Sequence, residues 1–181
     1  MEIIEKIKTY LRQRTLKKYS STVPTQIMSL SLVKTAVAVI DVEDTSYDTC
    51  KEALLAFFRE HKIKGEIFYF DFRVIDNKER LITSITNTVL KKDLNWYGKP
   101  SDESMKYLDD IKPDMFISLI RGTDFPIEFM ARYCPAKFKI GRTQLPGNVY
   151  DLVVSDPQTR ELNQAEVFDG IKQYIRIITG E

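Results

Sequence analysis

The sequence is poor in the residues that most often mark a catalytic or metal-binding site. Its 181 residues include two cysteines, one histidine and seven glycines. The glycines fit neither a GxGxxG nor a GxxxxGK(S/T) pattern, which disfavours a dinucleotide or P-loop phosphate site. The lone His61, in the polar sequence FREHKIKG, argues against a zinc site and leaves Cys50 and Cys134 without an evident base. We therefore predict no catalytic residue, no metal and no cofactor.

The sequence also lacks long apolar runs and an excess of either charge. It has 27 Lys and Arg against 26 Asp and Glu, a formal charge of +1, and 43% hydrophobic residues, as an ordinary globular domain does. No segment reaches the roughly 18 apolar residues of a spanning helix, and residues 1–20 lack the apolar core of about 7–15 residues that a signal peptide needs. We expect a cytoplasmic protein with two free thiols.

Strand and helix patterns alternate from residue 34 onward. Five apolar or β-branched runs predict strands at 35–42, 66–74, 113–120, 136–141 and 149–155. Helical patterns lie between them: one begins with a Thr45–Asp48 capping box and stops at Gly65, and others follow Ser101, span 125–134 and open at Asp156. Residues 78–92 fit either a helix or a strand. The alternation predicts an α/β fold over residues 23–181: a three-layer α/β/α sandwich with a Rossmann-like, mostly parallel sheet.

Residues 1–22 form a separate N-terminal unit, predicted as a basic amphipathic helix. Its apolar stripe lasts about three turns and consists of Ile3, Ile4, Ile7, Tyr10 and Leu11. The first 20 residues hold six bases and two acids, a net of +4, which leaves 21 bases and 24 acids, a net of −3, for the rest. Either the apolar face packs on the domain, or the helix binds a protein partner or an anionic membrane surface, which would attach the protein peripherally to the inner membrane. We do not expect nucleic acid as a partner.

Acids and arginines follow the predicted strands at their carboxyl ends, where ligands of parallel α/β sheets bind. The ligand-binding candidates are Asp41, Glu43 and Asp44 after the first strand, Arg121, Thr123 and Asp124 after the third, and Arg142 after the fourth. Together they suit a small polar or phosphorylated ligand. The alternative is structural: Asp44, Thr123 and Asp124 cap helices, and the arginines pair with the acids.

A loop with the sequence DLNWYG places two large aromatic side chains, Trp96 and Tyr97, in a polar connector. Such side chains can stack on a sugar or base, form part of a partner surface, or fold back onto the core. We favour the structural role, because aromatic residues usually owe their position to the area they bury.

The run PDMFISLIRGTDFPIEFMARYCPAKFKIGRTQ, from residue 113 onward, resembles one Rossmann-like domain of the bacterial heptosyltransferase-type glycosyltransferases. With the basic N-terminal helix, the NWYG loop (Asn95–Gly98) and the strand YDLVVS (Tyr150–Ser155), it is also similar to a family of short Bacteroidetes proteins of unknown function. The second resemblance implies a Rossmann-like fold and no established activity. The first supplies no catalytic residue, because none can be carried over with a matching motif. Those enzymes also have two such domains, whereas this chain has room for one.

These observations predict a non-catalytic module that binds a small ligand or a partner in the bacterial cytoplasm. The alternative is a nucleotide-sugar-dependent, glycosyltransferase-like protein completed by a partner chain, with Asp41, Glu43, Arg121 and Arg142 around the donor.

Overall fold

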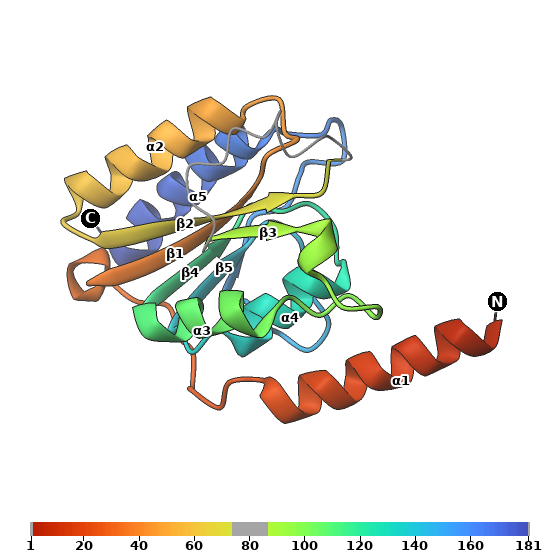
Figure 1. The fold of residues 1–181 in the computed structure, drawn as a ribbon. Coiled ribbons are helices and arrows are strands. Elements are labelled where there is room, and N and C mark those ends of the chain that lie inside the picture. Colours follow the sequence, from red (N-terminus) through yellow and green to blue (C-terminus); the bar gives the residue numbers. More distant parts are fainter. Residues whose placement is uncertain (1, 74–86, 181) are drawn as a thin grey trace.

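The computed structural model describes residues 2–73 and 87–180 as helices packed on a twisted sheet (Figure 1). The α-helices are α1 (Glu2–Tyr19), α2 (Tyr47–Glu60), α3 (Asp102–Ile111), α4 (Phe125–Tyr133) and α5 (Gln164–Thr179). The strands are β1 (Thr35–Asp41), β2 (Lys64–Asp71), β3 (Thr88–Leu90), β4 (Met115–Ser118), β5 (Phe138–Gly141) and β6 (Leu152–Val153). Short 3₁₀ helices span Leu30–Leu32 and Lys91–Asp93.

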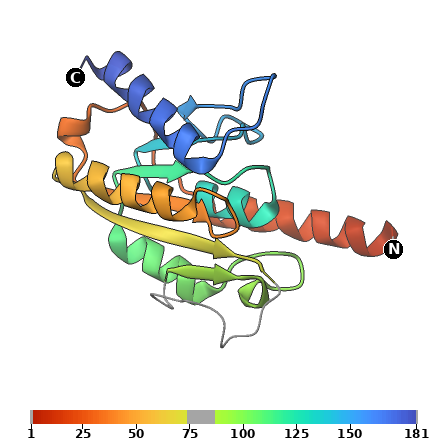
Figure 2. The same ribbon diagram turned by 90° about the horizontal axis from the view of Figure 1, so that it is seen from above.

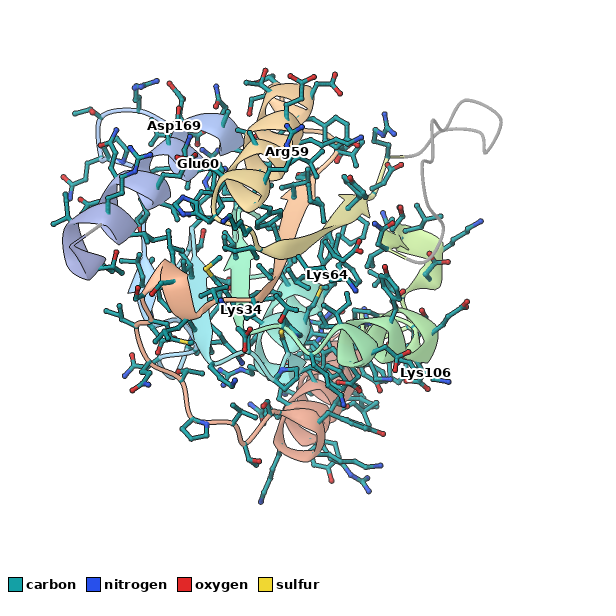
Figure 3. All side chains as sticks on the ribbon, turned by 90° about the vertical axis from the view of Figure 1, so that its left-hand side faces the viewer. Lys34, Arg59, Glu60, Lys64, Lys106 and Asp169 are labelled. Atoms are coloured by element: carbon teal, nitrogen blue, oxygen red, sulfur yellow. The ribbon has the colours of Figure 1, made fainter. Side chains whose placement is uncertain are left out.

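The six described strands form one parallel sheet in the order β3-β2-β1-β4-β5-β6. Helices α2 and α5 cover one face, and α3 and α4 cover the other (Figures 1 and 2). The predicted three-layer, Rossmann-like α/β fold is therefore confirmed. All carboxyl ends lie at one edge, and the amino ends lie at the other, where Lys34 and Lys64 are exposed (Figure 3).

The apolar run of β1 follows from its central place in the sheet. Successive side chains of a strand point to opposite faces, so a strand buried on both faces needs apolar residues at every position. Ala36, Ala38 and Ile40 enter the core beneath α2 and α5. Val37 and Val39 enter the core beneath α3 and α4.

Several predicted boundaries are wrong. Helix α2 has Ser46 as its N-cap residue, not Thr45, and it ends at Glu60. Gly65 is not a helix stop but the second residue of β2. Helix α5 starts at Gln164, because Asn163 and not Asp156 supplies the cap. Within the segment 78–92, Thr88–Leu90 form a strand, whereas residues 78–86 lie outside the described part of the chain.

Helix α1 packs on the domain through a face other than its apolar stripe. Arg12 Nε donates to the carbonyl oxygen of Tyr97 at 2.7 Å, and Thr15 Oγ1 donates to Tyr97 Oη at 3.5 Å. Arg12 also lies over the ring of Phe125, with its guanidinium carbon 5.2 Å from the ring centroid. Ile3, Ile4, Ile7 and Tyr10 are exposed, so the expectation that the apolar face packs on the domain is wrong for these residues.

The two aromatic residues of the DLNWYG loop differ in their surroundings. Tyr97 is half-buried against Phe125 and α1, as a structural role requires, whereas Trp96 is 59% exposed.

Gly65 provides a test of the packing between α2 and β2. A Cβ atom at this position would lie 2.0 Å from Cδ2 of Phe58, so Gly65→Ala forces the ring or the strand to move. We predict a loss of about 2 kcal/mol in the free energy of unfolding, measured by urea denaturation. In a Phe58→Ala background the same substitution should cost almost nothing, and an equal cost in both backgrounds would contradict the packing described.

Candidate functional site

A cavity of about 550 Å³ opens at the carboxyl edge of the sheet, beside the ends of β1 and β4. The strand order reverses at this point, since β1 connects onward to β2 on one side and β4 to β5 on the other. Ligands of open α/β sheets bind in this crevice. Its lining residues are Asp41, Glu43, Asp44, Thr45, Leu119, Arg121, Arg142, Arg160, Glu161, Leu162, Asn163, Gln164 and Glu166. We call it the carboxyl-edge cavity.

The cavity brings together five of the seven predicted ligand-binding residues: Asp41, Glu43, Asp44, Arg121 and Arg142. Thr123 and Asp124 are not among its lining residues. Asp124 is the N-cap residue of α4, which agrees with the structural alternative, although its side chain forms no capping hydrogen bond. The loop of Trp96 and Tyr97 contributes no lining residue either.

Gln164 joins the start of α5 to the end of β1. Its side chain is fully buried, its Oε1 accepts from the backbone N–H of Asp41 at 2.7 Å, and its Nε2 donates to the Asp41 carbonyl at 2.8 Å. The amide thus binds both backbone groups of Asp41, whose neighbour β4 ends at Ser118, opposite Val39. This fixes the first turn of α5 against the cavity.

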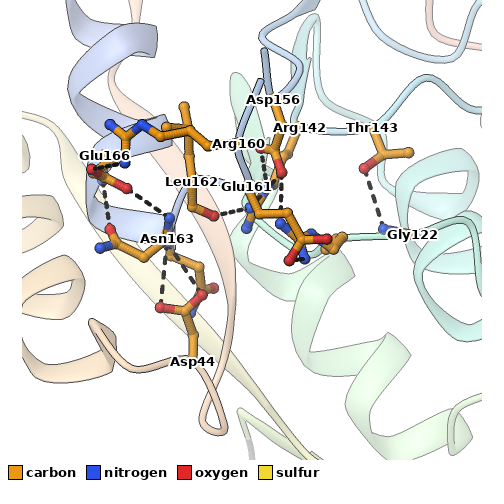
Figure 4. A network of polar contacts seen from close by, with 12 residues as sticks. Asp44, Gly122, Arg142, Thr143, Asp156, Arg160, Glu161, Leu162, Asn163 and Glu166 are labelled. Atoms are coloured by element: carbon orange, nitrogen blue, oxygen red, sulfur yellow. Dashed lines mark hydrogen bonds and ion pairs between the residues drawn. The ribbon is translucent and has the colours of Figure 1, made fainter. Parts of the chain in front are cut away.

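The N–H groups of the first turn of α5 already have partners within the chain (Figure 4). The Gln164 N–H lies 3.3 Å from each carboxylate oxygen of Asp44, and the Ala165 N–H donates to Ser46 Oγ at 3.0 Å. The Glu166 N–H donates to Asn163 Oδ1, and the Asn163 N–H donates to Glu166 Oε2, each at 2.9 Å, which is a capping box. A helix N-terminus attracts anions. Here a carboxylate of the protein itself, Asp44, fills that place.

An ion-pair network holds the segment between β6 and α5 against the sheet. Arg142, only 4% exposed, donates from Nε and Nη2 to the two oxygens of Asp156, each at 3.1 Å, and from Nη2 to the carbonyl of Leu162. Arg121 reaches Asp156 at 2.7 Å with Nη2 and Glu161 with Nη1. Burial works against ionisation of Asp156, but the hydrogen bonds from Arg142 and Arg121 outweigh it and lower its pKa.

The arginines of the cavity are therefore largely neutralised. Arg142 and Arg121 face Asp156 and Glu161, and Arg160 pairs with Glu166 at 2.9 Å. Within residues 2–73 and 87–180, neither Asp41 nor Glu43 forms an ion pair with a lysine or arginine. Burial raises the pKa of Asp41, and the nearby charges of Glu43, Asp44 and Asp71 add to this effect. The hydrogen bond from the Glu43 N–H lowers the pKa but does not cancel the increase. The lining holds five carboxylates and three arginines, so its net charge is negative.

The cavity offers hydrogen-bond acceptors but no activated nucleophile. Cys50 and Cys134 are buried free thiols outside the lining, and burial raises the pKa of each to about 12. Among the described residues, no group of His, Cys, Asp or Glu is arranged to hold a metal ion.

Sequence reasoning missed the wall that residues 156–166 build. The sequence pattern predicts a helix that starts at Asp156, and this prediction gives no reason to place Asp156, Gln164 or Glu166 in a site. One signal was present: Asn163 followed by Glu166 is the spacing of a capping box, and it marks the true start of α5.

Replacement of Asp156 by Asn tests the network. The substitution leaves the buried charge of Arg142 without its carboxylate, so we predict a loss of about 3 kcal/mol in unfolding free energy at pH 7. Because the folded-state pKa of Asp156 is lowered, its contribution is complete above the unfolded value of about 3.9 and is lost as the pH falls through the folded value. The difference between wild type and Asp156→Asn should therefore shrink in acid.

The exposed Asp110 on α3 supplies the control, since Asp110→Asn should change stability by less than about 0.5 kcal/mol. A constant difference between wild type and Asp156→Asn from pH 7 to acid would contradict the assignment.

Comparison with known proteins gives a family and no activity. No curated protein and no solved structure matches the chain. The resemblance of residues 113–144 to glycosyltransferases, and an origin in Bacteroidetes, thus stay predictions. The model of a family of unknown function, DUF6913, matches residues 5–178. This confirms the expected membership in a family without an established activity: the chain belongs to the DUF6913 family of unknown function.

Proposed function

We propose that the chain is a non-catalytic binding module and that the carboxyl-edge cavity holds a small polar molecule. The observation that carries this proposal is the position of the cavity at the point where the strand order reverses, with five predicted ligand-binding residues in its lining. No nucleophile or metal site among the described residues supplies a reaction, so binding is the simplest activity that the site supports.

The charge of the lining selects the ligand class. Asp41 and Glu43 form no ion pair with a lysine or arginine in the described part of the chain, and Arg73, which is paired with Asp71, acts on Glu43 only through space. Their oxygen acceptors suit hydroxyl or amino groups. A phosphate group fits less well, because Asp44 already accepts the Gln164 N–H and Ser46 Oγ accepts the Ala165 N–H at the start of α5. We therefore propose a ligand rich in hydroxyl or amino groups, and the phosphorylated ligand considered from the sequence loses support.

The alternative remains a nucleotide-sugar-dependent, glycosyltransferase-like protein completed by a partner chain. A nucleotide diphosphate in the same cavity would meet Asp41, Glu43 and Asp44 and would have to draw on arginines that are paired with acids. We propose a bacterial cytoplasmic location for either function, supported by two buried cysteines that remain unpaired.

A thermal-shift experiment separates the two functions. Glucose, glucosamine and ethanolamine form one set of probes, and UDP-glucose and inorganic phosphate form the other. We predict that a member of the first set, at a hundredfold excess over its Kd, raises the Tm by about 5 °C or more. A shift with UDP-glucose alone would favour the alternative, and no shift with either set at millimolar concentration would contradict the proposal.

Glu43→Gln is the matched variant, since Glu43 lines the cavity without belonging to the ion-pair network. It should weaken the ligand's affinity about tenfold or more, as expected for loss of a charged hydrogen-bond partner. Glu103→Gln on the exposed side of α3 is the control and should leave the shift unchanged. Equal shifts in wild type and Glu43→Gln would place the ligand elsewhere.

A further inference from the structure

Helix α1 presents an exposed row of side chains that no other part of the described chain covers. Ile3, Ile7, Tyr10, Arg14 and Lys17 follow one another at spacings of four and three residues, so they share one face of the helix. All five are exposed, and Ile3 is exposed by 72%. We call them the exposed row; its first half is apolar and its second half is basic.

The domain contacts a different face of the helix. Lys8, Arg12, Thr15 and Tyr19 form a second row at the same spacing, displaced around the helix from the first. Arg12 and Thr15 bind Tyr97, and the ring of Tyr19 packs edge-on against Phe129 with centroids 6.3 Å apart. An amphipathic helix usually buries its apolar stripe against its own domain. Here the polar row docks, and the amino-terminal half of α1 extends beyond the domain with its apolar side chains exposed (Figure 1).

The loop beside α1 adds an aromatic and a basic component. Trp96, 59% exposed, directly precedes Tyr97, the residue on which α1 docks, and stands edge-on to the Tyr97 ring. Lys91 and Lys92, a few residues earlier, are also exposed. Exposed tryptophan and lysine side chains are both common at membrane interfaces.

We propose that α1 and the loop Lys91–Trp96 attach the protein to an anionic lipid surface. Charge complementarity favours this occupant: the first 20 residues carry a net charge of +4, and the exposed row ends in Arg14 and Lys17. A second copy of the chain would bring two basic helices together. A protein groove normally takes apolar anchors along the length of a helix, whereas the apolar part of the exposed row ends at Tyr10. In the described residues no helix is long and apolar enough to cross a bilayer, so the attachment is interfacial.

Co-sedimentation of the full chain with vesicles tests the proposal. With phosphatidylglycerol–phosphatidylcholine vesicles we expect most of the protein in the pellet, with pure phosphatidylcholine little, and with anionic vesicles at high salt a reduced fraction. Ile3→Ser/Ile7→Ser should weaken binding at least tenfold. Ile177→Ser, at the exposed end of α5 (75% exposed), is the matched control and should bind as wild type does.

The charge component has its own matched pair of variants. Arg14→Glu/Lys17→Glu should abolish pelleting with anionic vesicles. Arg59→Glu/Lys64→Glu changes the net charge by the same amount, at the exposed residues labelled in Figure 3, away from α1. This variant should still pellet with anionic vesicles. Glu43→Gln should also pellet normally, so failure of the cavity proposal and failure of this one are distinguishable.

Three results would overturn the proposal. One is that wild type does not pellet with anionic vesicles. Another is that the α1 variants and their controls pellet equally. The third is a dimer, detected by sedimentation velocity without lipid, that Ile3→Ser/Ile7→Ser dissociates, because a second copy would then cover the row.

Discussion

The ion pair between the buried Arg142 and Asp156 is the interaction on which the carboxyl edge depends. A guanidinium that is 4% exposed requires a partner, and Asp156 supplies it from the segment that leads into α5. With Asp156 in place, the Leu162 carbonyl meets the same arginine, and Gln164 reaches the backbone of Asp41. The wall of the cavity, the start of α5 and the end of β1 are therefore positioned together.

That arrangement changes what a Rossmann-like sheet can bind. In dinucleotide-binding proteins of this architecture, a glycine-rich turn and a helix N-terminus accept the phosphates. Here Asp41 ends β1, and Glu43 and Asp44 lie in the turn that follows, which has no glycine. Asp44 accepts the first N–H of α5. The crevice of the fold is present, but its lining carries more carboxylates than arginines. This is why we propose a ligand with hydroxyl or amino groups.

The sequence predicted the features that depend on local patterns. Strand β1 was recognisable because both of its faces are buried. Five of the ligand-binding candidates line one cavity because parallel strands end at one edge. It did not predict the docking of α1, which depends on Tyr97, a residue more than 80 positions away from Arg12 and Thr15. An apolar stripe on a helix indicates a surface that can be buried, but it does not identify the partner that would bury it. The wall from Asp156 to Glu166 was missed because Asp156–Pro157 looked like a helix start, whereas Asn163 and Glu166 form the actual cap.

The central claim, that Asp44 closes the start of α5 to phosphate, is tested most directly by a ¹H–¹⁵N correlation spectrum recorded during titration with inorganic phosphate. The account predicts that the amide resonance of Gln164 keeps its position at millimolar phosphate in the wild type and moves in Asp44→Ala, where the carboxylate is gone. A saturable shift of this resonance in the wild-type protein would contradict it.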